Sequence, residues 1–175
     1  ISTVLFDTVS EVLHDRVPVK DIRPLTERDY TVRGCTALLD AIGGAIHHMR
    51  TIHKYARAED VPEHTMFIIT TDGIENASRR YSREKVKRMI ERQKATYGWE
   101  FLFLGANMDA IETAGQVGIG ADRAVNYQCD SEGTALNYEV VSEAIRSVRC
   151  SKPLCAEWKQ RIDEDYKQRG SRKHP

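Results

Sequence analysis

Runs of apolar and β-branched residues recur along the chain and predict a series of strands. The clearest run covers residues 66–71 (MFIITT) and has no charged residue, which is typical of a strand buried on both faces at the centre of a parallel sheet. Residues 1–6, 99–104 and 123–127 form related runs. Prolines interrupt and follow residues 12–23, so this segment is predicted to be an edge strand or part of a hairpin.

Between these runs, apolar residues return at intervals close to 3.6 and predict amphipathic helices that face a core. The predicted helices cover residues 36–54, 82–97, 109–117 and 136–148, with N-caps at Ser82 and Asp109 and a left-handed cap at Gly118. Strands and helices that alternate in this way predict a Rossmann-like α/β fold, with a doubly wound, mostly parallel sheet, helices on both faces and an antiparallel edge strand. We expect one such domain over residues 1–150, followed by a charged helix and tail over residues 151–175.

Charge and hydropathy narrow the classes of partner. Lys and Arg together number 26, as do Asp and Glu, so the formal net charge is zero, whereas proteins that bind nucleic acid or membrane surfaces are usually basic. No run approaches the roughly 18 apolar residues that a membrane-spanning helix needs. The four cysteines form no Cys-x-x-Cys pair, which favours reduced thiols. We therefore expect a cytoplasmic protein that binds neither nucleic acid nor membranes.

Candidate chemistry follows the predicted strands, because open α/β sheets bind ligands beyond the carboxyl ends of their strands. Asp72 comes directly after the run 66–71, where a buried carboxylate is costly unless it is paired, hydrogen-bonded or bound to a metal. Thr36 precedes the first long helix, and a hydroxyl together with a carboxylate suits Mg²⁺. A structural role is an open alternative, in which Asp72 caps the following loop and Thr36 caps its helix.

Two segments carry a resemblance to a known family. Residues 34–42 have the sequence GCTALLDAI, and residues 67–73 have the sequence FIITTDG, followed by Asn76. Together with the order of strands and helices over residues 1–149, these motifs resemble the von Willebrand factor type A domain. The chain is most similar to the bacterial intracellular members of that family.

That family binds a divalent cation at a metal-ion-dependent adhesion site, built from an Asp-x-Ser-x-Ser loop, a Thr in a second loop and an Asp in a third. The resemblance implies that Thr36 and Asp72 are metal ligands for Mg²⁺, Mn²⁺ or Ca²⁺. It also implies protein binding without catalysis, in which an acidic side chain of the partner completes the shell of the cation. The implied partner surface lies around Glu75, Asn76 and Asn107.

The chain departs from the family pattern, because it contains no Asp-x-Ser-x-Ser sequence. In the family's order Ile1 begins at the second strand, so we expect the chain to be a fragment that lacks the first strand and its metal loop. A second copy could then supply the missing strand pairing by exchange, which would give a homodimer. With one hydroxyl, one carboxylate and Asp7 as a third contributor, we expect weak cation binding or none.

Two other functions stay open from the sequence. A metal-dependent hydrolase or phosphotransferase could use Asp72, with Asp7 and Asn107 as the further groups at adjacent strand ends. The chain could also be an inert structural module whose metal site has been lost. Basic residues after Asp72 could face an acidic partner or begin a solvated helix. These residues are Arg79, Arg80, Arg83 and Lys85.

Overall fold

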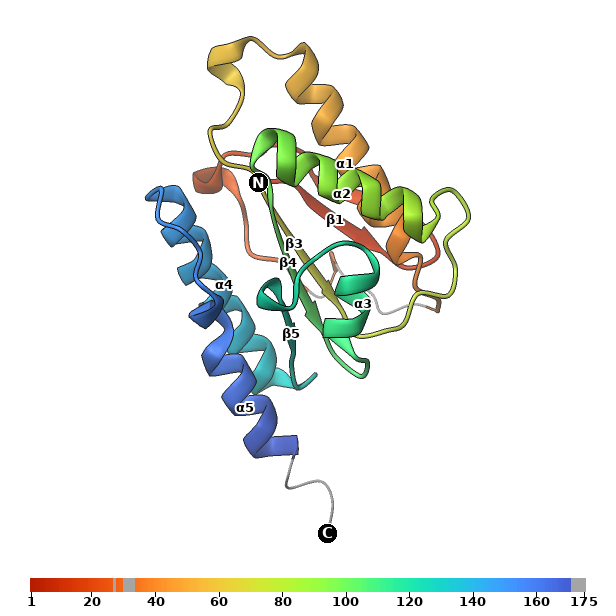
Figure 1. Cartoon of the computed structure of the whole chain (residues 1–175), viewed down its shortest axis with the longest axis vertical. Coiled ribbons are helices and arrows are strands. Elements are labelled where there is room, and N and C mark those ends of the chain that lie inside the picture. The colour runs from red at the N-terminus through yellow and green to blue at the C-terminus, as the bar shows by residue number, and fades with distance from the viewer. Residues whose placement is uncertain (27, 30–33, 171–175) are drawn as a thin grey trace. The chain divides into compact units, whose positions relative to one another are not determined.

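The computed structural model describes residues 1–26, 28–29 and 34–170 and has a mixed α/β architecture (Figure 1). The chain divides into two compact units. Unit 1 comprises Ile1–Ala56 and Ile74–Val86, and unit 2 comprises Arg57–Gly73 and Lys87–Pro175. The described residues form five α-helices, an antiparallel pair of strands and a parallel sheet. The predicted α/β class is therefore confirmed.

Unit 1 begins with an antiparallel pair of strands, β1 (Thr3–Phe6) and β2 (Ser10–His14). In the turn between them, the N–H of Asp7 donates to the Val9 carbonyl at 3.0 Å, and the Asp7 carboxylate accepts the Val9 N–H at 2.8 Å. The hairpin predicted over residues 12–23 is confirmed only in part, because its second strand covers Ser10–His14 and ends before Pro18.

The long helix of unit 1 is α1 (Leu38–Tyr55), close to the predicted bounds. Its buried side repeats at helical spacing. The buried residues are Leu38, Leu39, Ala41, Ile42, Gly43 and Ile46. At Gly43 the ring of Tyr81 packs so closely that a Cβ atom would meet a ring carbon, so this position requires glycine.

Unit 2 contains a parallel sheet in the order β3-β4-β5, formed by Met66–Thr71, Glu100–Gly105 and Ala124–Asn126. The central position predicted for β3 is wrong for the described sheet, because β4 is central and β3 pairs with β4 alone among the described strands. Ile68 of β3 is 38% exposed, whereas Leu102, its partner on β4, is fully buried. An apolar run indicates burial, but the neighbours of a strand depend on pairing with distant segments.

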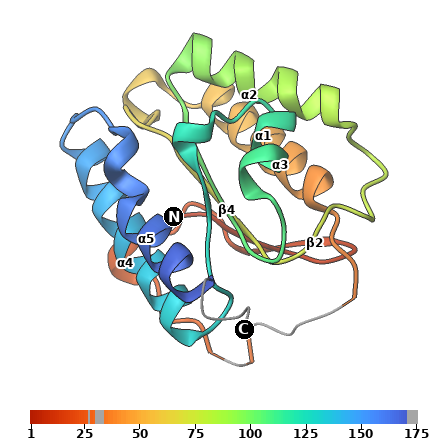
Figure 2. The ribbon, with the colours of Figure 1, turned by 60° about the horizontal axis from the view of Figure 1, so that its bottom comes forward.

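Helices cover both faces of this sheet. The helices α4 (Ser131–Arg149) and α5 (Gln160–Gly170) lie side by side on one face (Figure 2). The short helix α3 (Ala110–Gln116) lies on the other face. Side chains alternate along β4, so Gly105 and Phe101 point away from the face that Leu102 and Leu104 share. A Cβ atom at Gly105 would lie only 2.7 Å from the Ala110 Cβ, which places α3 on the Gly105 side. The remaining helix, α2 (Arg83–Tyr97), begins in unit 1 and ends in unit 2.

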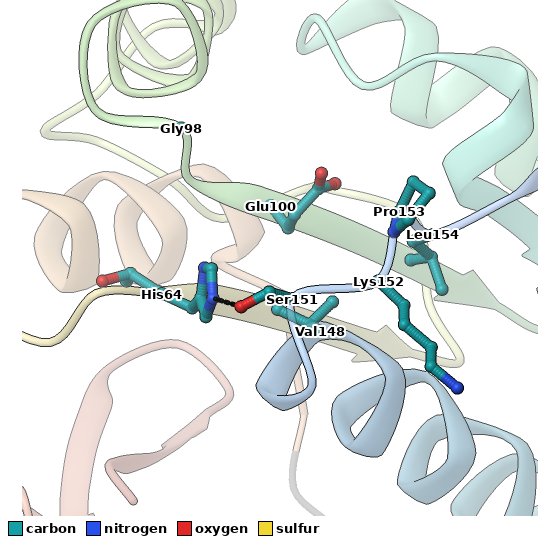
Figure 3. A pocket seen from close by; sticks show the side chains of 9 residues that line it. His64, Gly98, Glu100, Val148, Ser151, Lys152, Pro153 and Leu154 are labelled. Carbon is teal, nitrogen blue, oxygen red and sulfur yellow. Dashed lines mark hydrogen bonds between the residues drawn. The ribbon is translucent and has the colours of Figure 1, made fainter.

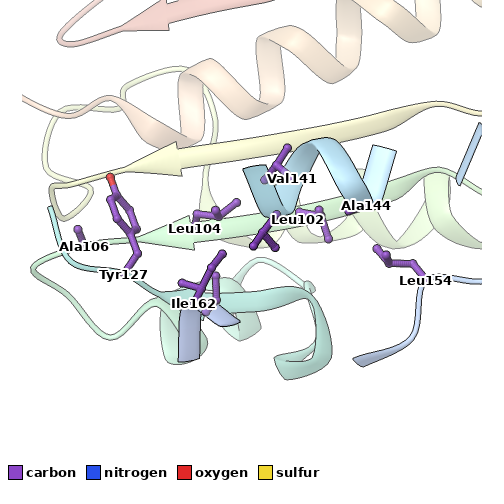
Figure 4. Close-up of a cluster of buried hydrophobic side chains, with 10 residues drawn as sticks. Leu102, Leu104, Ala106, Tyr127, Val141, Ala144, Leu154 and Ile162 are labelled. Atoms are coloured by element: carbon purple, nitrogen blue, oxygen red, sulfur yellow. The ribbon is translucent and has the colours of Figure 1, made fainter. Parts of the chain in front are cut away.

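A buried cluster joins β4 and β5 to α4 and α5 (Figure 4). The cluster consists of Leu102, Leu104, Ala106, Val125, Tyr127, Val140, Val141, Ala144, Leu154 and Ile162. The charged segment that follows residue 150 thus contributes two apolar side chains, and Ile162 is only 1% exposed. Burial of this kind anchors α5 to the parallel sheet.

Several helix ends follow local sequence signals. Ser82 accepts the Lys85 N–H at 3.3 Å at the start of α2, and Asp109 accepts the Glu112 N–H at 2.9 Å at the start of α3. Gly118 has a φ angle of +84°, as expected for a left-handed cap. The described residues also form four short 3-10 helices, Val19–Asp21, Ala58–Asp60, Ala121–Arg123 and Ala156–Lys159. Among the described helices, none combines the length and the apolar composition of a membrane span.

Candidate functional site

The start of α1 is capped by side chains from elsewhere in unit 1. Its N-cap residue is Ala37, which has no side-chain acceptor, so the first N–H groups of the helix need partners from outside the helix. Residues 74–81, here named the capping segment, provide them. The Leu39 N–H donates to Glu75 Oε2 at 2.9 Å, and the Asp40 N–H donates to Ser78 Oγ at 3.0 Å.

Glu75 also holds the capping segment in shape. Its Oε1 accepts the N–H groups of Ala77 and Ser78 at 3.0 and 2.8 Å, and its Oε2 accepts the Ser78 hydroxyl at 2.7 Å. Burial acts to raise the pKa of this carboxyl, but the hydrogen bonds outweigh burial and the pKa lies below its ordinary value. Glu75 is therefore ionised and serves as a connector within unit 1.

Asp40 of α1 makes the reciprocal connection. Its carboxylate accepts three consecutive backbone N–H groups, those of Arg79, Arg80 and Tyr81, each at 2.9 Å. Burial again acts to raise the pKa, but these three hydrogen bonds and the charge of Arg80 lower it below the ordinary value. The Glu75 carboxylate of the capping segment and the Asp40 carboxylate of α1 thus each hydrogen-bond to the other segment.

Thr36 and Asn76 join through their backbones and one amide side chain. The Thr36 N–H donates to Asn76 Oδ1 at 2.8 Å, and the Asn76 N–H donates to the Thr36 carbonyl at 3.0 Å. The next N–H, of Ala37, donates to the Asp7 carbonyl at 2.7 Å. Three segments of unit 1 therefore meet here. The Thr36 hydroxyl has no hydrogen-bond partner among the described residues, so it does not cap α1.

Apolar side chains remain exposed around this junction. Ile74, the first residue of the capping segment, is 65% exposed, and Val9 in the β1–β2 turn is 67% exposed. Ile74 stands directly before Glu75, whose carboxylate accepts four hydrogen bonds. An apolar side chain is thus exposed to solvent directly beside a residue whose side chain is held by four hydrogen bonds.

In unit 2, Asp72 follows the carboxyl end of β3 as its sequence position predicts, but it is exposed, so the desolvation cost expected of a buried carboxylate does not arise. No described backbone N–H donates to its carboxylate, so the loop-capping alternative is not formed in the described part of the chain. The Cys129 thiol approaches Asp72 Oδ2 at 4.0 Å. Burial raises the pKa of the nearby Tyr127 phenol, and the neighbouring Cys129 and Asp72 add to this increase (Figure 4).

Asn107 lies in the turn that follows β4 and is exposed. Its φ angle is +57°, a left-handed conformation that Asn tolerates better than most residues. Asn126, at the end of β5, accepts the Ala110 N–H at 2.9 Å and so ties the same turn to α3. Asn107 therefore has a local role in shaping the turn and leaves its side chain at the surface.

The predicted site residues divide between the two units. Thr36, Glu75 and Asn76 belong to unit 1, where the structure brings them together, and Asp72 and Asn107 belong to unit 2. Each set is therefore considered within its own unit. Among the described residues, no group of three or more His, Cys, Asp or Glu side chains could hold a metal ion.

No family model, curated protein or solved structure matches this chain. The von Willebrand factor type A resemblance accordingly stays a prediction.

Sequence reasoning missed Asp40, Ser78 and the structural role of Glu75. Their partners lie about forty positions away, as in the Asp40–Arg80 hydrogen bond, and no local motif links them. One indication was present in the sequence. The helix start at Ala37 lacks a good capping residue, which calls for acceptors from another segment.

A pocket of about 290 Å³ lies in unit 2, at the amino ends of β3 and β4 (Figure 3). In it, His64 Nε2 is 3.1 Å from Ser151 Oγ, and Ser151 has a φ angle of +52°. The N–H groups of Ser151 and Lys152 donate to the Val148 and Ser147 carbonyls, which closes the end of α4. Because both N–H groups are used, neither can stabilise an oxyanion beside Ser151.

Proposed function

We propose that the chain is a protein-binding module whose contact surface in unit 1 is centred on Ile74, with Thr36 and Asn76 beside it. The observation that carries this proposal is the exposed Ile74 side chain, 65% accessible, on a segment that the carboxylates of Glu75 and Asp40 bind to α1. A partner that covers Ile74 would remove its exposed apolar surface from water, which favours binding.

The energetics favour binding at this surface. Covering Ile74 with a partner would contribute about 1–2 kcal/mol from apolar burial alone. The N–H groups of residues 76–81 already have hydrogen-bond acceptors, so little conformational entropy is lost from that stretch when a partner binds. The Thr36 hydroxyl adds a polar group without a described partner, and Asn76 is exposed beside it.

A finer form of the proposal places this module in the von Willebrand factor type A class. In that form Thr36 of unit 1 and Asp72 of unit 2 are predicted cation ligands, and Asn76 and Asn107 are predicted partner-surface residues of their respective units. Glu75 then acts by holding the capping segment, because its carboxylate accepts hydrogen bonds from Leu39, Ala77 and Ser78. We expect affinity for Mg²⁺, Mn²⁺ or Ca²⁺ to be weak, since each unit offers few free oxygen ligands.

Site-specific photocrosslinking tests the proposal. The photoreactive residue p-benzoyl-phenylalanine replaces Ile74 in one variant and Val19, 60% exposed and also in unit 1, in the control. Both variants are expressed and irradiated in the organism whose genome encodes the chain, and the crosslinked adducts are identified by mass spectrometry. We expect one dominant protein adduct from position 74 and none from position 19. Equal adducts from both positions, or no adduct from position 74, would contradict the proposal and leave an inert module.

A further inference from the structure

We infer that the partner of this surface is an acidic protein segment, which binds the exposed cations Arg79, Arg80 and Arg83 of unit 1. This inference rests on the proposed function and adds the chemistry of the partner. It concerns the end of the capping segment and the residues that follow it, all of which belong to unit 1.

The charge of this stretch is strongly one-sided. Residues 79–85 (RRYSREK) contain four cations and one anion, in a chain whose net charge is zero. The three arginines are exposed. None of them forms an ion pair with a residue in the described part of the chain. Arg80 is attracted by the Asp40 carboxylate and its guanidinium lies 6.0 Å from the centre of the Tyr81 ring, but all three side chains stay accessible to a partner.

The backbone beneath these cations is fixed. The Asp40 carboxylate accepts the N–H groups of Arg79 and Arg80 at 2.9 Å. The ring of Tyr81 packs on Gly43, and the Lys85 ammonium lies 4.4 Å from the centre of that ring. Because Asp40 accepts backbone N–H groups and not guanidinium groups, it holds the segment without forming a hydrogen bond to the arginine side chains. Binding then costs side-chain entropy but little backbone entropy.

An acidic protein segment fits this cluster better than a nucleic acid does. The guanidinium group binds carboxylates through two parallel hydrogen bonds, which gives both energy and geometry. Nucleic-acid binding of useful strength neutralises about 6–10 phosphates along a groove, and four cations within seven residues are too few and too close together. Ile74, at the other end of the capping segment, supplies an apolar anchor that a protein partner can use.

Fluorescence anisotropy with the full chain tests this inference. The probe is a labelled peptide, EEELEEE, and the comparison ligands are QQQLQQQ and a single-stranded oligonucleotide of the same length. The variant Arg79→Gln/Arg80→Gln removes two charges but keeps both backbone N–H groups. The control Arg50→Gln/Lys54→Gln removes two exposed charges from α1 in the same unit.

We expect the acidic peptide to bind at about 50 mM NaCl and to weaken at about 300 mM NaCl, because salt screens exposed charges. The arginine variant should bind it about tenfold more weakly, a difference of about 1.4 kcal/mol, and the control should bind it like the wild type. Equal losses in both variants, no binding of the peptide, or tighter binding of the oligonucleotide would overturn the inference. Circular dichroism spectra of both variants establish that they are folded.

Photocrosslinking from position 74 separates this inference from the proposed function. If the adduct forms in the wild type but is undiminished in the Arg79→Gln/Arg80→Gln background, the acidic-partner inference fails while the binding module stands. If position 74 gives no adduct in the wild type, the proposed function fails first.

Discussion

The substitution Glu75→Gln should weaken the attachment of the capping segment to α1. Each carboxylate oxygen of Glu75 accepts two hydrogen bonds, and three of the four donors are backbone N–H groups. Gln has nearly the same shape but replaces one acceptor oxygen by an NH₂ donor. If the NH₂ group occupies the Oε2 position, the Leu39 N–H loses its acceptor. The opposite orientation strands the N–H groups of Ala77 and Ser78.

The cost follows from these two orientations. At least one partly buried backbone N–H is left without an acceptor, and the remaining hydrogen bonds lose the assistance of the charge. Together these losses amount to about 2–4 kcal/mol in the free energy of opening the capping segment. Since each 1.36 kcal/mol is a factor of ten, amide exchange should accelerate by about 30-fold to 900-fold.

Hydrogen–deuterium exchange read by mass spectrometry measures this effect, using peptides that cover residues 36–42 and 74–81. The matched control is Glu11→Gln, an exposed carboxylate on β2 of unit 1. We expect both peptides to exchange faster in Glu75→Gln and neither to change in Glu11→Gln. Exchange in Glu75→Gln that matches the control would refute the structural role of Glu75.

The same reasoning gives a pH dependence. The pKa of Glu75 is lower in the folded chain than its ordinary value of 4.5, so the stabilisation is complete above that value and is lost as the pH falls through the folded-state pKa. Wild-type protection of residues 74–81 should therefore decline below about pH 4.5. Glu75→Gln should show a shallower decline, which Asp40 alone produces. Parallel declines in the two proteins would contradict the assignment.

Three further predictions test packing and metal binding. Gly43→Ala places a methyl group against the Tyr81 ring, whereas a Cβ atom at Gly44 meets nothing within 4 Å. Thermal unfolding should therefore show a loss of about 1–3 kcal/mol in the free energy of unfolding for Gly43→Ala and no loss for the control Gly44→Ala. Ile162→Ala should lower the free energy of unfolding in urea by about 2–5 kcal/mol, because Ile162 is buried. The control Gln168→Ala, at an exposed position of α5, should leave it unchanged. Equal effects of the two substitutions would refute the anchoring of α5 by Ile162. Titration calorimetry with Mg²⁺ and Mn²⁺ should give no micromolar binding, and a micromolar affinity would overturn that expectation.

The sequence was sufficient for features that depend on neighbouring residues. The caps at Ser82 and Asp109 and the left-handed Gly118 follow from local backbone chemistry, and all three are present in the structure. The helical spacing of apolar residues likewise predicted α1 and α2 close to their observed bounds, whereas α4 begins five residues before its predicted start at 136. These interactions form within one turn of the chain, so a local pattern specifies them.

Contacts between segments that are distant in the sequence could not be predicted from the local pattern of apolar and polar residues. The apolar run of β3 indicated burial but not which strands flank it, and the structure places β4 at the centre. Glu75 was expected at a partner surface because it follows a strand end, yet its carboxylate accepts the N–H of Leu39, 36 positions away. Each outcome depends on tertiary contacts that no short window of sequence contains.

Asp40 affects binding of an acidic peptide in two opposite ways, because its negative charge repels the peptide while its hydrogen bonds hold the backbone of residues 79–81. Asp40→Asn removes a negative charge close to Arg80, so Coulomb attraction alone predicts tighter binding of the peptide EEELEEE. The substitution also leaves at least one N–H among residues 79–81 without its acceptor, because Asp40 Oδ2 accepts Arg79 and Oδ1 accepts Arg80 and Tyr81. If the fixed backbone matters more than net charge, Asp40→Asn binds the peptide more weakly despite its more positive surface, and anisotropy titration measures the sign. Tighter binding would show that charge alone attracts the peptide and that the hydrogen bonds from Asp40 contribute only to folding.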